Sequence, residues 1–506
     1  MKNGFAQAMA WLHTWGGLLM GWLLFVVCVS GTISCFDGEL DDWMRPALHG
    51  ATLPEQHGFD RAIAFSKRMM PDAHAWYIVA SGERERATEA WLYRDDGSYE
   101  NYALDPRTGA PLPDTIGGDF FFTLHYNLHA GVLGQYVVGL AGMFMLLAVI
   151  TGIVIHRRFF RDFFTFRPRA GRQRAWLDGH NLTGVIGLPF HLLMAYTGVI
   201  IFAAMYMTAG VDTAYDGDVL KFYEEAGDSY ERPEVGKPLA TLASADALVA
   251  DATRRLGRAP DWVNVHHTDD ASATISLGGD NSRHVGWDVR SVTYDAADGR
   301  LLHVTGDLGG GYDTYRFLGG LHMAQFGGAP LRWLYFLLGL STCVMIACGL
   351  QVWVAKRAQK IAASPRHIGY RLVQGLNIGV VAGMPLACAC VLIANRLLPA
   401  TLDARAQWEA TAFCAVWAAA ALYGLLFARG WRGLFALTAV VLGAVPLVNL
   451  ATSPHSHLGA SFARGDWALA AVDLTTLALA SGFAWLAHRA ARHERVAYAM
   501  PATAEG

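Results

Sequence analysis

The sequence has little charge for its length. Charged residues make up 16% of its 506 positions and hydrophobic residues make up 53%, whereas soluble domains carry about 25% charged residues. This shortage excludes a soluble enzyme and a disordered chain. The net charge is only −3, so we expect no nucleic-acid partner.

Cysteines and several cofactor motifs are missing from the polar parts of the chain. All seven cysteines lie in or beside apolar stretches, at Cys28, Cys35, Cys343, Cys348, Cys388, Cys390 and Cys414. The long polar connectors therefore hold no disulfide and no thiolate metal site. The lack of a CxxCH motif excludes covalent c-type haem. Glycine-rich strings lie inside apolar stretches, so no nicotinamide or flavin site is expected.

What the sequence has instead is long apolar stretches. Each is about twenty residues, enough to cross a hydrocarbon core about 30 Å thick. They lie near 10–35, 132–155, 182–207, 332–355, 372–395, 410–428, 433–450 and 467–488. They predict an all-α polytopic membrane bundle of about eight transmembrane helices. The first stretch is too long for a cleaved signal peptide, and no small-residue cleavage site follows it.

Positive charge is concentrated in the short connectors. The connector 158–178 is rich in arginine, and basic residues also follow the fourth and sixth apolar stretches and the last one. By the positive-inside rule these segments are cytoplasmic, and so are both termini. The two long connectors are then periplasmic. Both are acidic, with 16 Asp and Glu against 8 Lys and Arg in 37–128, and 19 against 10 in 208–331.

These observations predict the order of domains along the chain. We expect a first span at 10–36, a periplasmic module at 37–124, a second span at 125–157, a cytoplasmic arginine-rich loop at 158–178, a third span at 179–207, a second periplasmic module at 208–320, a fourth span at 321–357 and a C-terminal extension of four spans at 365–490.

The two periplasmic modules repeat one pattern. Each begins with a segment that suits a helix and continues with segments that alternate polar and apolar residues, as strands do. Each also ends similarly, in ALDPRTGAPL and in TYDAADGRLL. The repetition indicates an internal duplication of an α+β module. Neither copy shows a nucleophile–base pair or a phosphate loop, so we interpret both as binding or spacer modules.

Histidines at the ends of the first four spans carry the strongest functional signal. Seven of the 19 histidines lie there: His13, His125, His129, His156, His180, His191 and His322. Ionisable residues at membrane depth are costly and are functional candidates by default. Imidazoles from opposing helices of a bundle are suitable axial ligands of a haem iron. The set predicts two non-covalent haem b groups, one near each membrane face, and nearby glycines would give a flat macrocycle room.

The pairing of the ligands remains open. For the outer haem we favour His129 with His322, although His125 lies one helical turn from His129 and is an alternative. For the inner haem we favour His13 with His180.

The same histidines suit other roles as well. His156 is the substitute ligand at the inner site. His180 and His191 are eleven residues apart and would share a face of one helix, so His191 either ligates or relays between the two sites. A zinc site at His125 and His129 has too few ligands and no HExxH base. A proton relay is disfavoured because these spans contain almost no carboxylates.

Several motifs together resemble the PepSY-associated transmembrane-helix family. They are LHTWGG, LHYNLHAG, VITGIVIHRR, WLDGHNLTGVIGLPFHLLMAYTGVIIF and LHMAQFGGAPLRWLYFLLGL, in the order of the family. The resemblance covers about residues 5–360, and the two module endings resemble those of PepSY domains. Residues 365–490 resemble a C-terminal extension found in longer members.

The resemblance implies an iron-regulated inner-membrane protein of a Gram-negative bacterium. It also implies a haem-containing ferric-siderophore reductase that acts at the periplasmic face. The residues on which it places haem ligation are His13, His129, His180 and His322.

The function expected from the sequence is therefore a haem-b membrane oxidoreductase. It would take electrons from quinol or from a cytoplasmic reductase and pass them across the bilayer to a periplasmic Fe(III)–siderophore or other Fe(III) chelate, releasing Fe(II). We also expect the protein to contact membrane lipid. The alternative is a non-redox membrane protein whose modules bind peptides or inhibit proteases.

Overall fold

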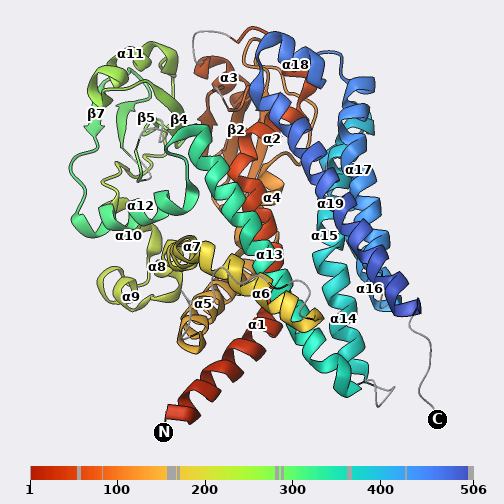
Figure 1. The fold of residues 1–506 in the computed structure, drawn as a ribbon. Coiled ribbons are helices and arrows are strands. Elements are labelled where there is room, and N and C mark those ends of the chain that lie inside the picture. Colours follow the sequence, from red (N-terminus) through yellow and green to blue (C-terminus); the bar gives the residue numbers. More distant parts are fainter. Residues whose placement is uncertain are drawn as a thin grey trace, which may run out of the picture. The chain divides into compact units, whose positions relative to one another are not determined.

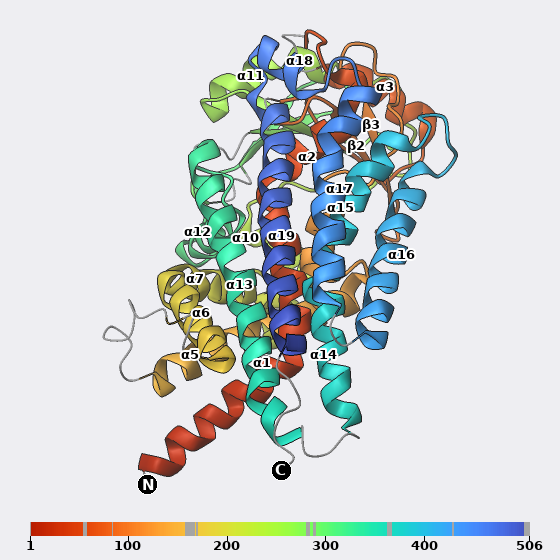
Figure 2. The same ribbon diagram turned by 45° about the vertical axis from the view of Figure 1, so that its right-hand side comes forward.

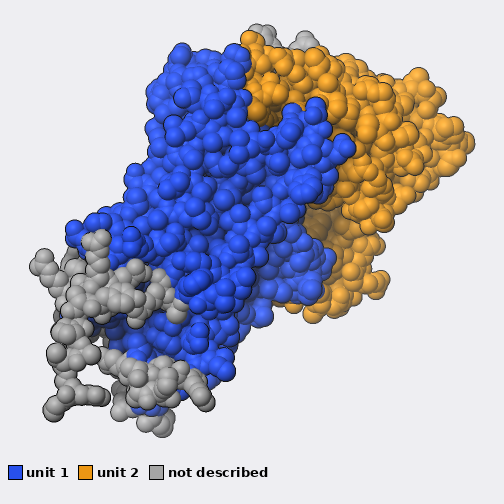
Figure 3. Space-filling view, turned by 90° about the vertical axis from the view of Figure 1, so that its right-hand side faces the viewer, with its two compact units in different colours: residues 1–44, 115–196, 334–506 blue, residues 45–114, 197–333 orange. Residues whose placement is uncertain are grey.

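A computed structural model gives the fold of residues 2–53, 58–82, 84–156, 167, 171–279, 284–286, 290–361, 367–427 and 430–499. Most of the arginine-rich loop expected at 158–178 lies outside these described residues. The chain divides into two compact units (Figure 3). Unit 1 comprises residues 1–44, 115–196 and 334–506, and unit 2 comprises residues 45–114 and 197–333.

Seven helices in the described part of the chain are long and apolar enough to cross a membrane, and a bent pair of helices is a candidate for an eighth crossing. The seven segments are Gly4–Met44, Gly131–Ile155, Gly328–Ala358, Ile368–Leu397, Arg405–Leu426, Trp431–Thr452 and Trp467–Arg492. The protein is thus a multi-pass membrane protein with a mostly helical fold, as the apolar stretches predict.

The helices of the first part of the membrane bundle follow the expected order. They are α1 (Lys2–Ile33), α2 (Asp37–Met44), α4 (Asp119–Asn127), α5 (Gly131–Ile155), α6 (Arg172–Ile186), α7 (Leu188–Ile201) and α13 (Gly328–Ile361). Short helices α8 (Ala203–Tyr206), α9 (Ala209–Tyr215), α10 (Val219–Ala226) and α12 (Gly310–Met323) belong to unit 2.

The third expected span is broken. Helix α6 ends at Ile186 and α7 begins at Leu188, and their axes differ by 70°. The break lies at Gly187, two residues before Pro189, whose ring nitrogen has no hydrogen to donate to a helical carbonyl. The prediction that His180 and His191 share one helical face is therefore wrong, because they lie on different sides of this bend.

The last four candidate spans pack mainly with one another in unit 1. They consist of α14 (Ile368–Val381) with α15 (Gly383–Leu397), α16 (Arg405–Leu426), α17 (Trp431–Thr452) and α19 (Trp467–Ala499), with the short α18 (Leu458–Arg464) before the last. Helices α17 and α19 lie side by side (Figures 1 and 2). Close approach of α14 and α16 requires a small residue at Gly379, where a Cβ would lie 2.6 Å from Cα of Ala421.

Unit 2 contains one antiparallel sheet built from both long connectors. Its strands are β1 (Ala75–Val79), β2 (Thr88–Tyr93), β3 (Tyr99–Leu104), β4 (Pro260–His266), β5 (Thr274–Gly279), β6 (Ser291–Asp295) and β7 (Leu301–Val304). Their order is β3-β2-β1-β4-β5-β6-β7. The two modules expected from the sequence are thus joined edge to edge by the pairing of β1 with β4, which removes one exposed sheet edge from each.

The two helices of the sheet, α3 (Phe59–Met69) and α11 (Ala245–Leu256), cap each other. The carboxylate of Asp246 accepts hydrogen bonds from the backbone N–H groups of Phe59 and Asp60. The carboxylate of Asp60 accepts from the N–H groups of Ala245 and Asp246 in return. Each aspartate therefore satisfies amides that the first turn of the other helix leaves without a partner, an exchange consistent with a duplicated module.

The core of unit 2 lies between these helices and the sheet. Helix α3 contributes Phe59 and Ile63, one turn apart, and β1 contributes Trp76 and Ile78, which point to the same face of the strand. Val263 of β4 belongs to the same cluster, so one core spans the junction of the two modules. This packing holds the β1–β4 junction in a single register.

Candidate functional site

Three of the predicted histidines come together in unit 1. His13 of α1 and His180 of α6 face each other with ring centroids 6.0 Å apart and planes inclined by 67°. His156, which follows α5, is close enough to both rings to interact with them electrostatically. The structure therefore brings together the residues of the inner site.

Each ring of this pair is oriented by a backbone carbonyl of another helix. Nδ1 of His13 donates to the carbonyl of Ala148 at 3.0 Å, and Nδ1 of His180 donates to the carbonyl of Met345 at 2.8 Å. These hydrogen bonds select the tautomer with the proton on Nδ1. They leave the lone pair on Nε2, the atom that a neutral imidazole offers to a metal.

Each ring also lies against a glycine of another helix. A Cβ at Gly152 of α5 would be 3.4 Å from the His13 ring, and a Cβ at Gly349 of α13 would be 3.1 Å from the His180 ring. A larger residue at either position would press on the imidazole. Glycine here lets the ring lie close to the neighbouring backbone.

His125 of α4 has the same surroundings. Its Nδ1 donates to the carbonyl of Val27 in α1 at 2.8 Å, and a Cβ at Gly31 would be only 2.5 Å from that nitrogen. In unit 2, Nδ1 of His322 in α12 is hydrogen-bonded to the hydroxyl of Thr197 at 2.9 Å. A Cβ at Gly198 of α7 would be 3.0 Å from the His322 ring.

The four histidine–glycine pairs reveal a duplication within the membrane part. Gly31 follows His13 by 18 residues, as Gly198 follows His180. Gly152 follows His125 by 27 residues, as Gly349 follows His322. The same two spacings thus occur in the first and in the second half of this region, and each glycine packs on a histidine of its own half. This repetition is consistent with a duplication that includes the helices as well as the modules. The counterpart of His322 is then His125.

His129 differs from these four. Helix α4 ends at Asn127, and both Leu128 and His129 have positive φ angles, of 56° and 53°. The prediction that His125 and His129 lie one turn apart on a helix is therefore wrong. The His129 ring stacks on Phe120 with centroids 4.5 Å apart, and its Nε2 donates to the Phe120 carbonyl at 2.9 Å. His129 belongs to unit 1 and His322 to unit 2, and their pairing stays a prediction.

His191 of α7 is the most deeply buried of the predicted set, with 1% of its surface exposed. Its Nε2 has no hydrogen-bond partner among the described residues. A Cβ at Gly187 would be 2.5 Å from that nitrogen, so the ring lies directly over the break between α6 and α7. A buried imidazole nitrogen without a partner is costly and is a candidate for a function.

Glycines near the predicted histidines were expected to give a cofactor room, and of these Gly187 contacts a histidine, His191. A Cβ at Gly17 or at Gly131 would meet no described atom within 4 Å. At Gly320 a Cβ would be 1.5 Å from the carbonyl oxygen of Val285, so this glycine permits close packing of a loop on α12. Four other glycines that contact histidines, Gly31, Gly152, Gly198 and Gly349, were missed because each lies in a different helix from the histidine that it contacts.

Sequence reasoning also missed a buried polar network in the last four spans. Glu409 and Asp473 are both fully buried. Glu409 pairs with Arg405 at 2.8 Å and accepts hydrogen bonds from Asn395 and from the hydroxyl of Thr115. Asp473 accepts from Trp43 and from Asn449. The presence of ionisable residues inside apolar stretches could have indicated this network. Its hydrogen bonds connect α2 and the segment before α4 to the C-terminal helices.

Comparison with known proteins gives the family of the chain. The family model described as the PepSY-associated TM region matches residues 10–356. A relative in Pseudomonas aeruginosa, the uncharacterized protein PA4219, is 30% identical over 403 residues, which are 75% of this chain and 98% of the relative. The chain therefore belongs to the family of proteins with a PepSY-associated transmembrane region.

Proposed function

We propose that the protein is a haem-b oxidoreductase of the bacterial inner membrane that reduces a periplasmic Fe(III) chelate. The observation that carries the proposal is shared by His13, His125, His180 and His322. Each has its Nδ1 held by a hydrogen bond, and each lies against a glycine of another helix. Four rings prepared in one way, in two matching pairs, suit two bis-histidine haem sites.

His13 and His180 are the proposed ligands of the inner haem. They are counterparts in the duplication, and their rings face each other in unit 1. The carbonyls of Ala148 and Met345 fix both rings before the cofactor binds, which reduces the entropy lost on binding. His156 lies beside both rings and suits a supporting contact to a haem propionate.

For the outer haem we favour His125 over His129 as a ligand. Nδ1 of His125 donates to a backbone carbonyl, as Nδ1 of His13 and of His180 does. Nε2 of His129 instead donates a proton to the Phe120 carbonyl and is engaged. The duplication supports the same choice, since the counterpart of His322 is His125.

Bound haem would supply a centre that accepts and gives up one electron at a time. Backbone carbonyls beside His13, His125 and His180 fix the tautomers of these imidazoles. His191 carries an unpartnered Nε2 near His180 and is the candidate for a contact between the two sites.

The proposed acceptor is a ferric siderophore or a similar chelate. Reduction weakens the hold of hard oxygen ligands on iron, so Fe(II) would be released. The acidic connectors favour a neutral or cationic chelate over a strongly anionic one, an effect that added salt should weaken. The proposed electron donor is quinol or a cytoplasmic reductase.

The first test is the haem itself. Protein purified in detergent from cells supplied with haem should be red, its Soret band should shift when dithionite is added, and a pyridine haemochrome assay should give two haems b per chain. Colourless protein after haem supplementation would contradict the proposal.

The second test is iron reduction. Dithionite-reduced protein, freed of excess dithionite and mixed anaerobically with an Fe(III)–siderophore, should reoxidise as Fe(II) appears in a ferrozine assay. The two signals should have the same rate. Haem that reoxidises without Fe(II), or Fe(II) that forms without haem oxidation, would reject the ferric chelate as the acceptor.

A further inference from the structure

The junction of the two modules in unit 2 gathers three histidines. His74 precedes β1, and His266 and His267 end β4 and follow it. The β1–β4 pairing sets Ala75 opposite His266, and the N–H of His267 donates to the carbonyl of His74 at 2.8 Å. The ring centroid of His74 is 5.4 Å from that of His266 and 5.3 Å from that of His267. The register of the sheet therefore forces three imidazoles together.

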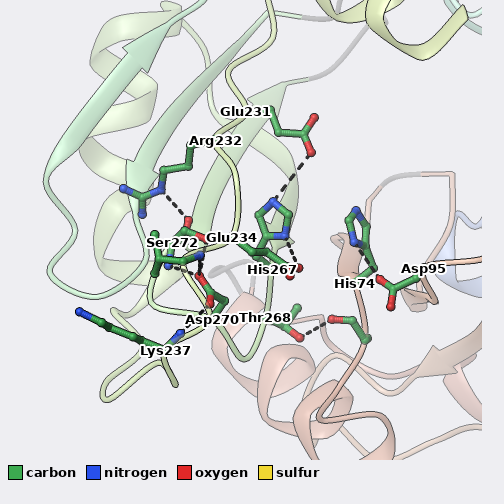
Figure 4. Close-up of polar contacts among 12 residues, drawn as sticks. His74, Asp95, Glu231, Arg232, Glu234, Lys237, His267, Thr268, Asp270 and Ser272 are labelled. Atoms are coloured by element: carbon green, nitrogen blue, oxygen red, sulfur yellow. Dashed lines mark hydrogen bonds and ion pairs between the residues drawn. The ribbon is translucent and has the colours of Figure 1, made fainter. Parts of the chain in front are cut away.

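Carboxylates lie beside the rings of His74 and His267 (Figure 4). Nδ1 of His267 donates to Glu234 at 2.8 Å, and Nδ1 of His74 lies 3.2 Å from a carboxylate oxygen of Asp95. A ligating histidine in a metal site commonly gives its second ring N–H to a carboxylate in this way, which fixes the tautomer and raises the basicity of the other nitrogen. Both rings thus keep Nε2 for a ligand.

Nε2 of His267, by contrast, lacks a hydrogen bond to any described residue. The His267 ring is only 7% exposed. The nearest acidic atom is a carboxylate oxygen of Glu231, 3.8 Å away. An imidazole lone pair beside a carboxylate is unfavourable unless a proton or a metal cation lies between them. His267 also has a φ of 51°, which is uncommon for a residue other than glycine.

The segment that carries both glutamates is held in place by hydrogen bonds (Figure 4). Asp270 accepts from the N–H groups of Val235 and Lys237 and from Ser272. These hydrogen bonds, that of the Ser272 hydroxyl foremost, hold the pKa of Asp270 well below its ordinary value, so it stays ionised at neutral pH. Arg232, between the glutamates, donates to the carbonyl of Ala273. The donor groups are therefore positioned by the fold.

We propose that this junction binds a divalent transition-metal ion. The ligands are His74, His266, His267 and Glu231, while Glu234 and Asp95 orient two of the imidazoles. Donor atoms of His74, His266 and Glu231 lie within 4.8 Å of one another. Nε2 of His267 lies 3.8 Å from a carboxylate oxygen of Glu231. Donors of a tetrahedral zinc site are about 3.3 Å apart, so the four donors would move closer together when the ion binds.

The donor set selects the class of ion. Three imidazole nitrogens and one carboxylate oxygen suit Zn²⁺, and also Cu²⁺, Ni²⁺ or Fe²⁺, and do not suit Mg²⁺ or Ca²⁺. The bound ion would join the first connector, which supplies His74, to the second, which supplies the other ligands. The site is independent of the haem proposal, because all its residues belong to unit 2.

The test uses the full-length protein in detergent, stripped with EDTA and titrated with Zn²⁺ by calorimetry against a competing chelator. We expect one high-affinity Zn²⁺ per chain, no binding of Mg²⁺, and a dissociation constant raised at least tenfold by His74→Ala or His267→Ala. His303→Ala is the matched control, since His303 lies in β7 of the same sheet and contacts Asp228 instead. Zn²⁺ affinity equal in all four proteins, or no binding by the parent, overturns the proposal.

A second variant and a second readout guard against misfolding. Glu231→Gln changes a partly exposed side chain outside the core and should also weaken Zn²⁺ binding. A ligand that binds only the folded state raises its melting temperature. Zn²⁺ should therefore raise the melting temperature of the parent and of His303→Ala, and raise that of Glu231→Gln much less. An equal rise in Glu231→Gln and the parent would show that the ion binds elsewhere.

Discussion

The group that contacts Nδ1 differs between the histidines of the membrane bundle and those at the sheet. In the bundle, His13, His125 and His180 give Nδ1–H to backbone carbonyls. In the sheet, His74 and His267 place Nδ1 beside carboxylates. A carbonyl keeps the imidazole neutral at low cost inside an apolar bundle, whereas a carboxylate there would need a counter-charge.

One residue type is thus held in two different ways, which suit the two kinds of metal centre that we propose. A neutral ring held by a carbonyl suits haem iron, whose other ligands come from the macrocycle. A ring supported by a carboxylate is more basic and suits a small cation drawn from water. The partner of the second nitrogen, and not the histidine itself, distinguishes the two.

The long connectors, which form the sheet, and the short connectors of the bundle should lie on opposite sides of the membrane, and reporter fusions test this directly. Because the long connectors are acidic and the short ones basic, a reporter fused after Gly109 or Gly299 should behave as exported. A fusion after Ala358 should behave as cytoplasmic. Cytoplasmic reporter activity at Gly109 or Gly299 would contradict the expected location of the long connectors.

Loss of one inner ligand should remove one haem. His180→Ala deletes an imidazole that the Met345 carbonyl orients, so pyridine haemochrome should fall from two haems per chain to one. His74→Ala, in the sheet, should leave the haem content unchanged. Full haem content in both His180→Ala and His13→Ala would show that these rings are packing residues.

At the outer site, substitution of the two neighbouring histidines His125 and His129 should affect haem content differently. His125→Ala should lose the outer haem, because Nδ1 of His125 donates to a backbone carbonyl as in His13 and His180, whereas His129→Ala should keep it, because Nε2 of His129 is bound to the Phe120 carbonyl. Haem content and the reduced spectrum of the two variants measure this. The reverse result would restore His129 as the ligand.

The buried charges of the last four spans should affect stability without affecting haem. Glu409→Ala removes the carboxylate that pairs with the buried Arg405, and loss of one partner of a buried pair costs about 3–5 kcal/mol. The melting temperature should fall while haem content per folded chain stays constant. Gln407→Ala, an exposed neighbour in the same helix, is the control. A fall in haem content at unchanged stability would instead tie this network to the cofactor.

The smallest effect is expected at the reciprocal caps of unit 2. Asp60→Ala removes the acceptor for two amides at the start of α11, and loss of such a cap costs about 1 kcal/mol. Thermal unfolding should show a modest loss in Asp60→Ala and none in the exposed Asp72→Ala. Zn²⁺ affinity should be unchanged, which separates stability of the sheet from its histidine cluster.

Much of the fold could be predicted from the sequence. The apolar stretches give the membrane helices because their length alone matches the hydrocarbon core. The alternating segments give the strands, and the repeated module endings give the duplication. The bend at Gly187 was missed, because a single Gly near Pro189 does not distinguish a kinked span from a break.

The candidate sites were predictable to different degrees. The membrane histidines stand out because imidazoles are rare in apolar sequence. The cluster of His74, His266 and His267 gave no such signal, because histidines are ordinary in polar connectors and the first lies in a different connector from the other two.

The sequence alone determined the multi-pass class, the supply of histidines and the duplicated modules, since these follow from local composition and periodicity. Only the tertiary structure decided that β1 pairs with β4, that glycines of other helices contact the membrane histidines, and that Glu409 is buried with Arg405. These contacts join residues far apart in the chain. Their formation depends on packing and register, which no local pattern of residues encodes.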